Sequence, residues 1–96
     1  MRPSEALAKH RDEVLAIIAR YPVSNPRVFG SVARGEDVEG SDIDILVDTH
    51  ATTSTFDLAG LEIELEKLLS FPVGVHTLRE FLPESTARIE AEHRVL

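Results

Sequence analysis

Residues 43–48, IDILVD, constrain the fold more than any other segment of this chain. Successive side chains of a β-strand point to opposite faces, so the alternation in this segment is typical of a half-buried strand. One face carries Ile43, Ile45 and Val47, and the other carries Asp44, Leu46 and Asp48. Asp42 extends the second face by one step. We therefore predict a core strand that places two like charges, Asp42 and Asp44, side by side on one face.

The segments around this strand alternate between helical and extended patterns. Helices are predicted over residues 4–21, 31–36, 56–71 and 83–93, and strands over 27–30, 43–48 and 72–78. Ser4 is the predicted N-cap of the first long helix, and Ser54 or Thr55 that of the second. Residues 22–26, which contain two prolines, are predicted to be a break. The order indicates an α/β (α+β) fold, a small sheet flanked by helices, and 96 residues suit a single domain over 1–96.

Composition narrows the classes of function. The chain has no cysteine, which excludes disulfide frameworks and Cys-based zinc sites. A formal net charge of −7 disfavours direct binding to nucleic acid. The first residues are charged where a signal peptide is apolar, and no apolar run approaches the ~20 residues that span a bilayer. We expect a cytoplasmic protein with no membrane contact, which a homo- or hetero-oligomeric partner would stabilise.

Asp42 and Asp44 are the candidate metal ligands and catalytic residues. Two carboxylates on one side of a partly buried strand repel each other, unless one takes up a proton or a cation lies between them. Oxygen ligands at this spacing suit Mg²⁺, which usually shares its coordination shell with substrate phosphates. The other acidic residues of the segment, Glu36, Asp37 and Glu39, are expected to be solvated.

Gly30, Ser31 and Arg34 are the candidate nucleotide-binding residues. Gly30 allows a tight turn and a close approach of the backbone to a ligand. If a helix begins at Ser31, its free N–H groups face any phosphate placed there, and Arg34 lies one helical turn further on. The segment lacks the Lys-Ser/Thr pair of a P-loop and the G-x-G-x-x-G of a dinucleotide site.

The two halves of this constellation stand at a fixed spacing. Gly30 and Ser31, ten residues, and then Asp-Ile-Asp at 42–44 resemble the signature of the DNA polymerase beta-like nucleotidyltransferase superfamily. Together with the length, "FGSVARGE" and "SDIDILVD" look like its minimal nucleotidyltransferase branch, the antitoxin partners of HEPN-domain toxins. The resemblance implies a mixed sheet flanked by helices, Mg²⁺ at Asp42 and Asp44, and a triphosphate at Gly30 and Ser31. It also implies transfer of AMP from ATP to a tyrosine of the toxin.

The chain departs from the family pattern at one position. The family usually has a third carboxylate on the strand after the long helix, where this chain has Gly74. Asp48 lies roughly 13 Å along the strand from Asp44, too far to replace that carboxylate at one ion. His76 lies on the same strand face as Gly74, about 7 Å along, and is either a base or weak ligand or a surface residue.

Three functions are therefore open. The first is the adenylyltransferase antitoxin. The second is a binding module, impaired in catalysis at Gly74, which neutralises its partner by complex formation alone through Ile63 and residues 93–96. The third is a transferase that acts on RNA ends or on a small molecule, which the acidic charge disfavours.

Overall fold

The computed structural model describes all of residues 1–96. The elements, in chain order, are α1 (Pro3–Lys9), α2 (Arg11–Ile18), β1 (Val23–Phe29), α3 (Gly30–Arg34), β2 (Ile43–Thr49), α4 (Thr55–Leu69), β3 (Val73–His76), a 3₁₀ turn η1 (Leu78–Glu80), α5 (Pro83–Glu92) and β4 (Arg94–Val95). None of the helices combines the length and the apolar character needed to cross a membrane.

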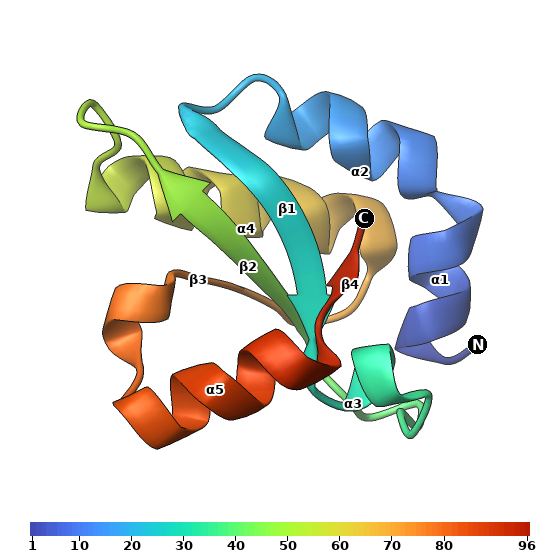
Figure 1. The fold of residues 1–96 in the computed structure, drawn as a ribbon. Helices are drawn as coiled ribbons and strands as arrows, with labels where there is room; N and C mark the ends of the chain where they lie inside the picture. The colour runs from blue at the N-terminus through green and yellow to red at the C-terminus, as the bar shows by residue number, and fades with distance from the viewer.

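The four strands form one mixed sheet in the order β3-β2-β1-β4. β1 runs antiparallel to β2 and to β4, whereas β2 and β3 are parallel. The parallel pair is joined through α4, as such crossovers require. Figure 1 shows the sheet between α4 behind it and α5 in front of its lower part. The predicted α/β class and mixed sheet are therefore confirmed.

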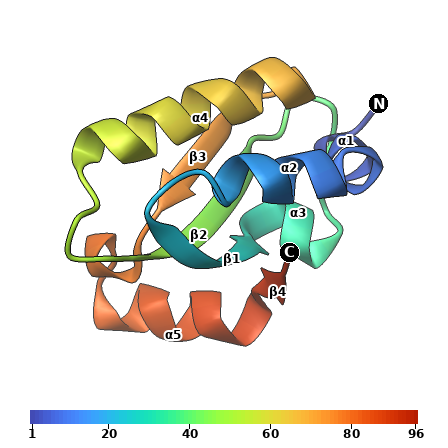
Figure 2. The same cartoon turned by 90° about the horizontal axis from the view of Figure 1, so that it is seen from above.

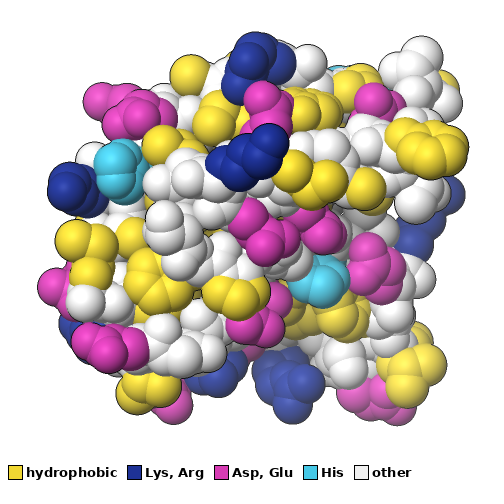
Figure 3. All heavy atoms as spheres, turned by 180° about the vertical axis from the view of Figure 1, so that it is seen from behind, with side chains coloured by type: hydrophobic (Ala, Val, Ile, Leu, Met, Phe, Trp, Pro, Cys, Tyr) yellow, Lys and Arg dark blue, Asp and Glu magenta, His cyan; other side chains and the backbone are white.

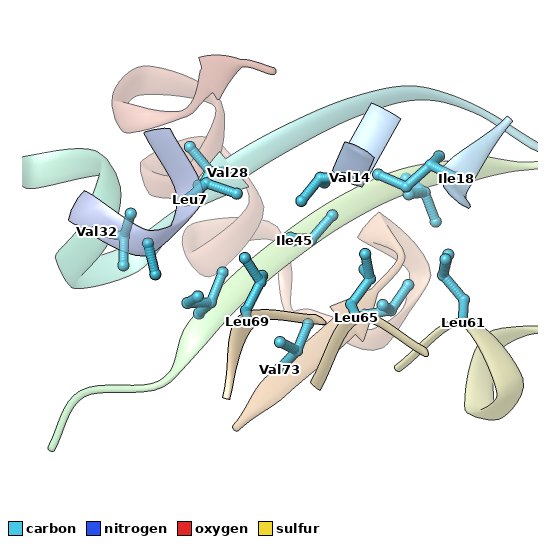
Figure 4. Close-up of a cluster of buried hydrophobic side chains, with 14 of the residues drawn as sticks. Leu7, Val14, Ile18, Val28, Val32, Ile45, Leu61, Leu65, Leu69 and Val73 are labelled. Carbon is cyan, nitrogen blue, oxygen red and sulfur yellow. The ribbon is translucent and has the colours of Figure 1, made fainter. Parts of the chain in front are cut away.

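Helices cover the two faces of the sheet unequally. Figures 1 and 2 show α1, α2 and α4 on one face and α5 alone on the other. The main core lies on the first face, where Ile43, Ile45 and Val47 of β2 meet Leu61 and Leu65 of α4, all at most 1% exposed. Figure 4 shows these helices and strands directing apolar side chains into one cluster. Burying each such side chain contributes about 1.5–3 kcal/mol.

The face under α5 carries a smaller apolar cluster. Its buried members are Phe29, Leu46 and Ile89. Leu46 is therefore on the opposite side of β2 from its neighbours Ile45 and Val47, as the alternation predicted. The same alternation places Asp44 on the α5 face, near one end of this small cluster.

The predicted helix over 4–21 is wrong as a single element. It breaks at His10 into α1 and α2. Ser4 is not an N-cap either, because it lies inside α1 and its backbone N–H donates to Oδ2 of Asp37 at 2.8 Å. Asp37, expected to be solvated, is only 2% exposed. A carboxylate from a distant loop thus caps one N–H at the start of α1, while the helix's own Glu5 accepts from the N–H of Arg2.

The predicted break over 22–26 is also wrong, since β1 begins at Val23 and its first residues pair with the end of β2. The register shifts between Ser24 and Arg27, and Asn25 has φ +51°. This bulge is how the strand accommodates the second proline. Arg27 is buried and its guanidinium lies 3.0 Å from Oδ1 of Asp48.

The long helix α4 is capped as predicted. Ser54 Oγ accepts from the N–H of Asp57 at 3.1 Å, and the Asp57 carboxylate accepts in return from the N–H of Ser54 at 2.8 Å. Near the middle of the helix, the Glu62 carboxylate accepts from the N–H of Val75 at 3.0 Å. α4 is thereby tied to the outer edge of β3. Ile63 is exposed on this helix, as predicted.

Candidate active site

Strand register gathers the candidate residues around Asp44. In the ladder, Asp44 stands opposite Phe29 of β1 on one side and opposite Gly74 of β3 on the other. Gly30 follows Phe29 directly and begins α3. Asp44 is therefore the residue on which the glycine turn, the acidic strand and β3 converge.

Gly30 is in close contact with Asp44. Its φ of +74° lies in the left-handed region, which side chains with a Cβ adopt at a cost. A Cβ at this position would also lie 2.9 Å from Oδ2 of Asp44, closer than carbon and oxygen normally approach. Glycine at position 30 thus satisfies two separate requirements. The space left by the missing Cβ of Gly30, called the cradle below, lies directly against the Asp44 carboxylate.

His76 reaches back along β3 to Asp44. Its Nε2 lies 3.4 Å from Oδ1 of Asp44, and its Nδ1 lies 3.0 Å from Oε2 of Glu80 in η1. The contact with Asp44 raises the pKa of His76 to about 9, against the opposing effect of burial and with further help from Glu80. Its side chain is only 29% exposed. His76 therefore lies beside Asp44 and is not a free surface residue, and its role as a base or weak ligand stays a prediction.

Gly74 leaves the space that the His76 ring fills. A Cβ at position 74 would lie 2.5 Å from Nε2 of His76 and 3.4 Å from Oδ1 of Asp44. A side chain on residue 74 and the observed ring position of His76 are thus mutually exclusive. The imidazole takes the place beside Asp44 that a side chain on residue 74 would otherwise occupy.

The remaining predicted site residues lie near this centre but differ in their surroundings. Asp42 is exposed and immediately precedes β2, and Ser31 is half-buried as the second residue of α3. The Arg34 guanidinium lies 3.2 Å from Glu36 and 3.2 Å from Glu92 of α5. In this structure Arg34 therefore ties α3 to α5.

A cavity of about 690 Å³ opens beside Gly30, between α3 and α5. It is lined by Phe29, Gly30, Arg34, Phe81, Ser85, Arg88, Ile89 and Glu92. Two aromatic rings give it an apolar part, and Arg34, Arg88 and Glu92 give it a charged part. The contributions of Phe81, Ser85 and Arg88 were not foreseen, because residues 78–93 carry no motif and the packing of α5 onto the sheet is set by tertiary contacts.

The donor chemistry at this centre fits a divalent cation that is shared with a ligand. No three side chains of the His, Asp, Glu and Cys types are gathered closely enough to hold a metal ion. Asp44 nevertheless offers carboxylate oxygens, the ligands that Mg²⁺ prefers, directly against the open cradle at Gly30. Phosphates and water would complete such a shell. Figure 3 shows acidic side chains spread over the face opposite that of Figure 1, consistent with the net charge of −7.

Comparison with known proteins gives consistent results. The family model "Nucleotidyltransferase domain" matches residues 7–96. The chain is 39% identical over 77 residues, 80% of this chain and 83% of the other, to the "putative protein adenylyltransferase MJ0435" of Methanocaldococcus jannaschii. It is 42% identical over 69 residues to the protein adenylyltransferase MntA of Thermococcus cleftensis, covering 72% of this chain and 67% of that protein.

Solved structures share the same fold. A "putative minimal nucleotidyltransferase" superposes with a TM-score of 0.86 at 38% identity, over 97% of this chain and 95% of the other. A toxin–antitoxin structure with AMP-PNP superposes with a TM-score of 0.75 over 88% of this chain and 69% of the other. Its identity of 20% supports a common fold and nothing finer.

Proposed function

Because the chain belongs to the nucleotidyltransferase domain family, we propose that it is an adenylyltransferase antitoxin acting through one domain over residues 1–96. With Mg²⁺, it transfers AMP from ATP to a tyrosine hydroxyl of a partner HEPN-domain toxin and so neutralises that toxin. The observation that carries this proposal is the packing of Gly30 against the Asp44 carboxylate, 2.9 Å from the Cβ position. The names of the adenylyltransferase relatives add support.

The proposed reaction forms a bond between the tyrosine oxygen and the α-phosphorus of ATP and releases pyrophosphate. Asp42 and Asp44 would hold Mg²⁺, and Gly30 and Ser31 would bring the backbone against the triphosphate. When bound, Mg²⁺ would neutralise charge on the phosphates. Positioning and electrostatics are the main contributions of a protein to phosphoryl-type transfer, so few side chains are needed.

Arg34 and Arg88 support the proposal from the cavity beside Gly30. Both line this cavity, and guanidinium groups bind phosphate oxygens in pairs of hydrogen bonds. Arg34 would have to exchange Glu36 or Glu92 for a phosphate. Because both of these ion pairs are partly exposed, that exchange costs little.

Transfer of label from α-labelled ATP to the HEPN partner tests this function. The variant carrying Asp42→Asn and Asp44→Asn should lose transfer, whereas the wild type labels the partner. A control with Asp12→Asn and Glu84→Gln removes the same charge at two exposed positions. Absence of label from a folded wild-type complex, or equal labelling by the Asp42/Asp44 variant, would contradict the proposal.

A binding module is the second candidate, and Gly74 is the observation that favours it. Position 74 supplies no carboxylate, and the space beside it is filled by His76. Neutralisation by complex formation alone would survive the Asp42→Asn and Asp44→Asn changes. Its loss, with complex formation intact by gel filtration, supports catalysis instead.

A further inference from the structure

We infer that His76, held by Glu80, is a nitrogen ligand to the cation at Asp44, and that the site accordingly favours Mn²⁺ over Mg²⁺. This inference rests on the proposed function, because it concerns the cation shared with the nucleotide. It assigns to an imidazole the position beside Asp44 that Gly74 leaves open.

The separation of the two donor atoms fits one shared ion. Two ligands at bond lengths of about 2.0–2.2 Å, with an angle of roughly 90–110° at the metal, lie about 3.0–3.5 Å apart. Nε2 of His76 and Oδ1 of Asp44 are 3.4 Å apart. A cation can therefore contact both atoms without movement of either strand.

The other ring nitrogen has the partner that metal-binding histidines usually have. Such a histidine donates its second ring N–H to a carboxylate or carbonyl, which fixes its orientation. Here Nδ1 lies 3.0 Å from Oε2 of Glu80. A cation binds an imidazole nitrogen that carries no proton, so Nε2 would have to be deprotonated when the cation is bound.

Aromatic packing restricts the ring further. The centroid of the His76 ring lies 5.4 Å from that of Phe29, edge to face, and 5.9 Å from that of Phe81. These contacts and Glu80 together hold Nε2 toward Asp44. An exposed surface histidine would lack both restraints.

The type of ligand atom determines which cation the site binds more tightly. Mg²⁺ prefers a shell made of oxygen atoms, whereas imidazole suits later first-row ions. Mn²⁺ takes the same carboxylate and water ligands as Mg²⁺, and it is also the first member of the first-row series that binds nitrogen ligands. A shell with Asp44, His76 and nucleotide oxygens therefore favours Mn²⁺ more strongly than a shell of carboxylates alone.

Pulsed electron paramagnetic resonance on the full chain with Mn²⁺ and a non-hydrolysable ATP analogue tests the inference directly. The wild type and His50→Gln, a control at an exposed loop histidine, should show coupling to an imidazole nitrogen. His76→Gln should lose that coupling. Glu80→Gln should weaken Mn²⁺ binding about tenfold and leave Mg²⁺ binding nearly unchanged.

The outcomes separate this inference from the proposed function. Mn²⁺ that binds with the nucleotide but shows no nitrogen coupling in the wild type overturns the role of His76 alone. It would leave His76 as an ion-pair partner of Asp44. Failure of Mn²⁺ and Mg²⁺ to bind with the nucleotide at all overturns both. Because the wild-type spectrum decides the matter, the test does not depend on the folding of His76→Gln.

Discussion

Gly30→Ala and Gly35→Ala form a matched pair that separates backbone strain from disturbance of the site. Both glycines have left-handed backbone, with φ of +74° and +71°. Alanine there costs about 1–2 kcal/mol, offset by about 0.4–1 kcal/mol from the stiffer unfolded chain. Each variant should therefore lose roughly 1 kcal/mol of stability, which lowers Tm by about 4–8 °C for a chain of this size.

Only the Gly30→Ala substitution places a methyl group against Asp44. A Cβ at Gly30 would lie 2.9 Å from Oδ2 of Asp44, whereas nothing lies within 4 Å of a Cβ at Gly35. The carboxylate must turn to avoid the new methyl group, and its oxygen then no longer faces the cradle. We expect Gly30→Ala to weaken binding of the metal–nucleotide pair by at least about tenfold, equivalent to ~1.4 kcal/mol, with Gly35→Ala near wild type.

Thermal unfolding and calorimetric titration with Mg²⁺ or Mn²⁺ and an ATP analogue measure the two effects separately. The reasoning is refuted if both variants bind the nucleotide equally well. It is also refuted if Gly30→Ala is as stable as the wild type, because the left-handed backbone would then carry no cost.

Two further predictions concern stability. Asp37→Asn should cost about 1 kcal/mol at neutral pH, because the charged oxygen that accepts from the N–H of Ser4 becomes a neutral amide oxygen and the hydrogen bond weakens. Burial acts to raise the pKa of the Asp37 carboxyl. Its hydrogen bonds with Ser4 lower the pKa by more than burial raises it, so that the pKa lies below its ordinary value of 3.8. The advantage of aspartate is therefore present above pH ~4 and shrinks as pH falls through the lowered pKa, so melting curves of the two proteins should converge in acid. Leu65→Ala, at a fully buried position, should lower the free energy of unfolding in urea by about 2–5 kcal/mol. Ile63→Ala, on the exposed side of α4, should change it by no more than about 0.5 kcal/mol. Similar losses of stability for both variants would contradict the assigned faces of α4.

Local patterns were sufficient for the elements that decide the fold. The alternation in residues 43–48 assigned each side chain of β2 to the correct face, because one face is apolar and a register slip would expose it. The cap of α4 was predicted to be Ser54 or Thr55, and Ser54 is the residue that caps it, since a cap is a contact between near neighbours. Gly30 was predicted to be a turn residue for the same local reason.

Most features that the sequence did not predict involve contacts between residues distant in sequence, or a side chain that points backwards along its own strand. The burial of Asp37 accompanies a contact between residues 33 positions apart, and no residue type marks the break of the first helix at His10. The pairing of β4 with β1 depends on the path of α5. His76 was placed about 7 Å from Gly74 by strand rise, but its side chain covers that distance backwards along β3. Strand rise gives the distance between backbone positions, whereas a long side chain can reach a residue two positions away on the same strand face.

The hydrogen bond from Val75 to Glu62 bears on how this chain can assemble. β3 is an edge strand, and an edge strand with free N–H groups invites pairing with a strand of another molecule. The Glu62 carboxylate already occupies one of these donors. An incoming chain would have to displace an anion before it could form its own ladder. The Glu62 carboxylate therefore opposes strand addition by another molecule at this edge, which is the route by which exposed edge strands aggregate.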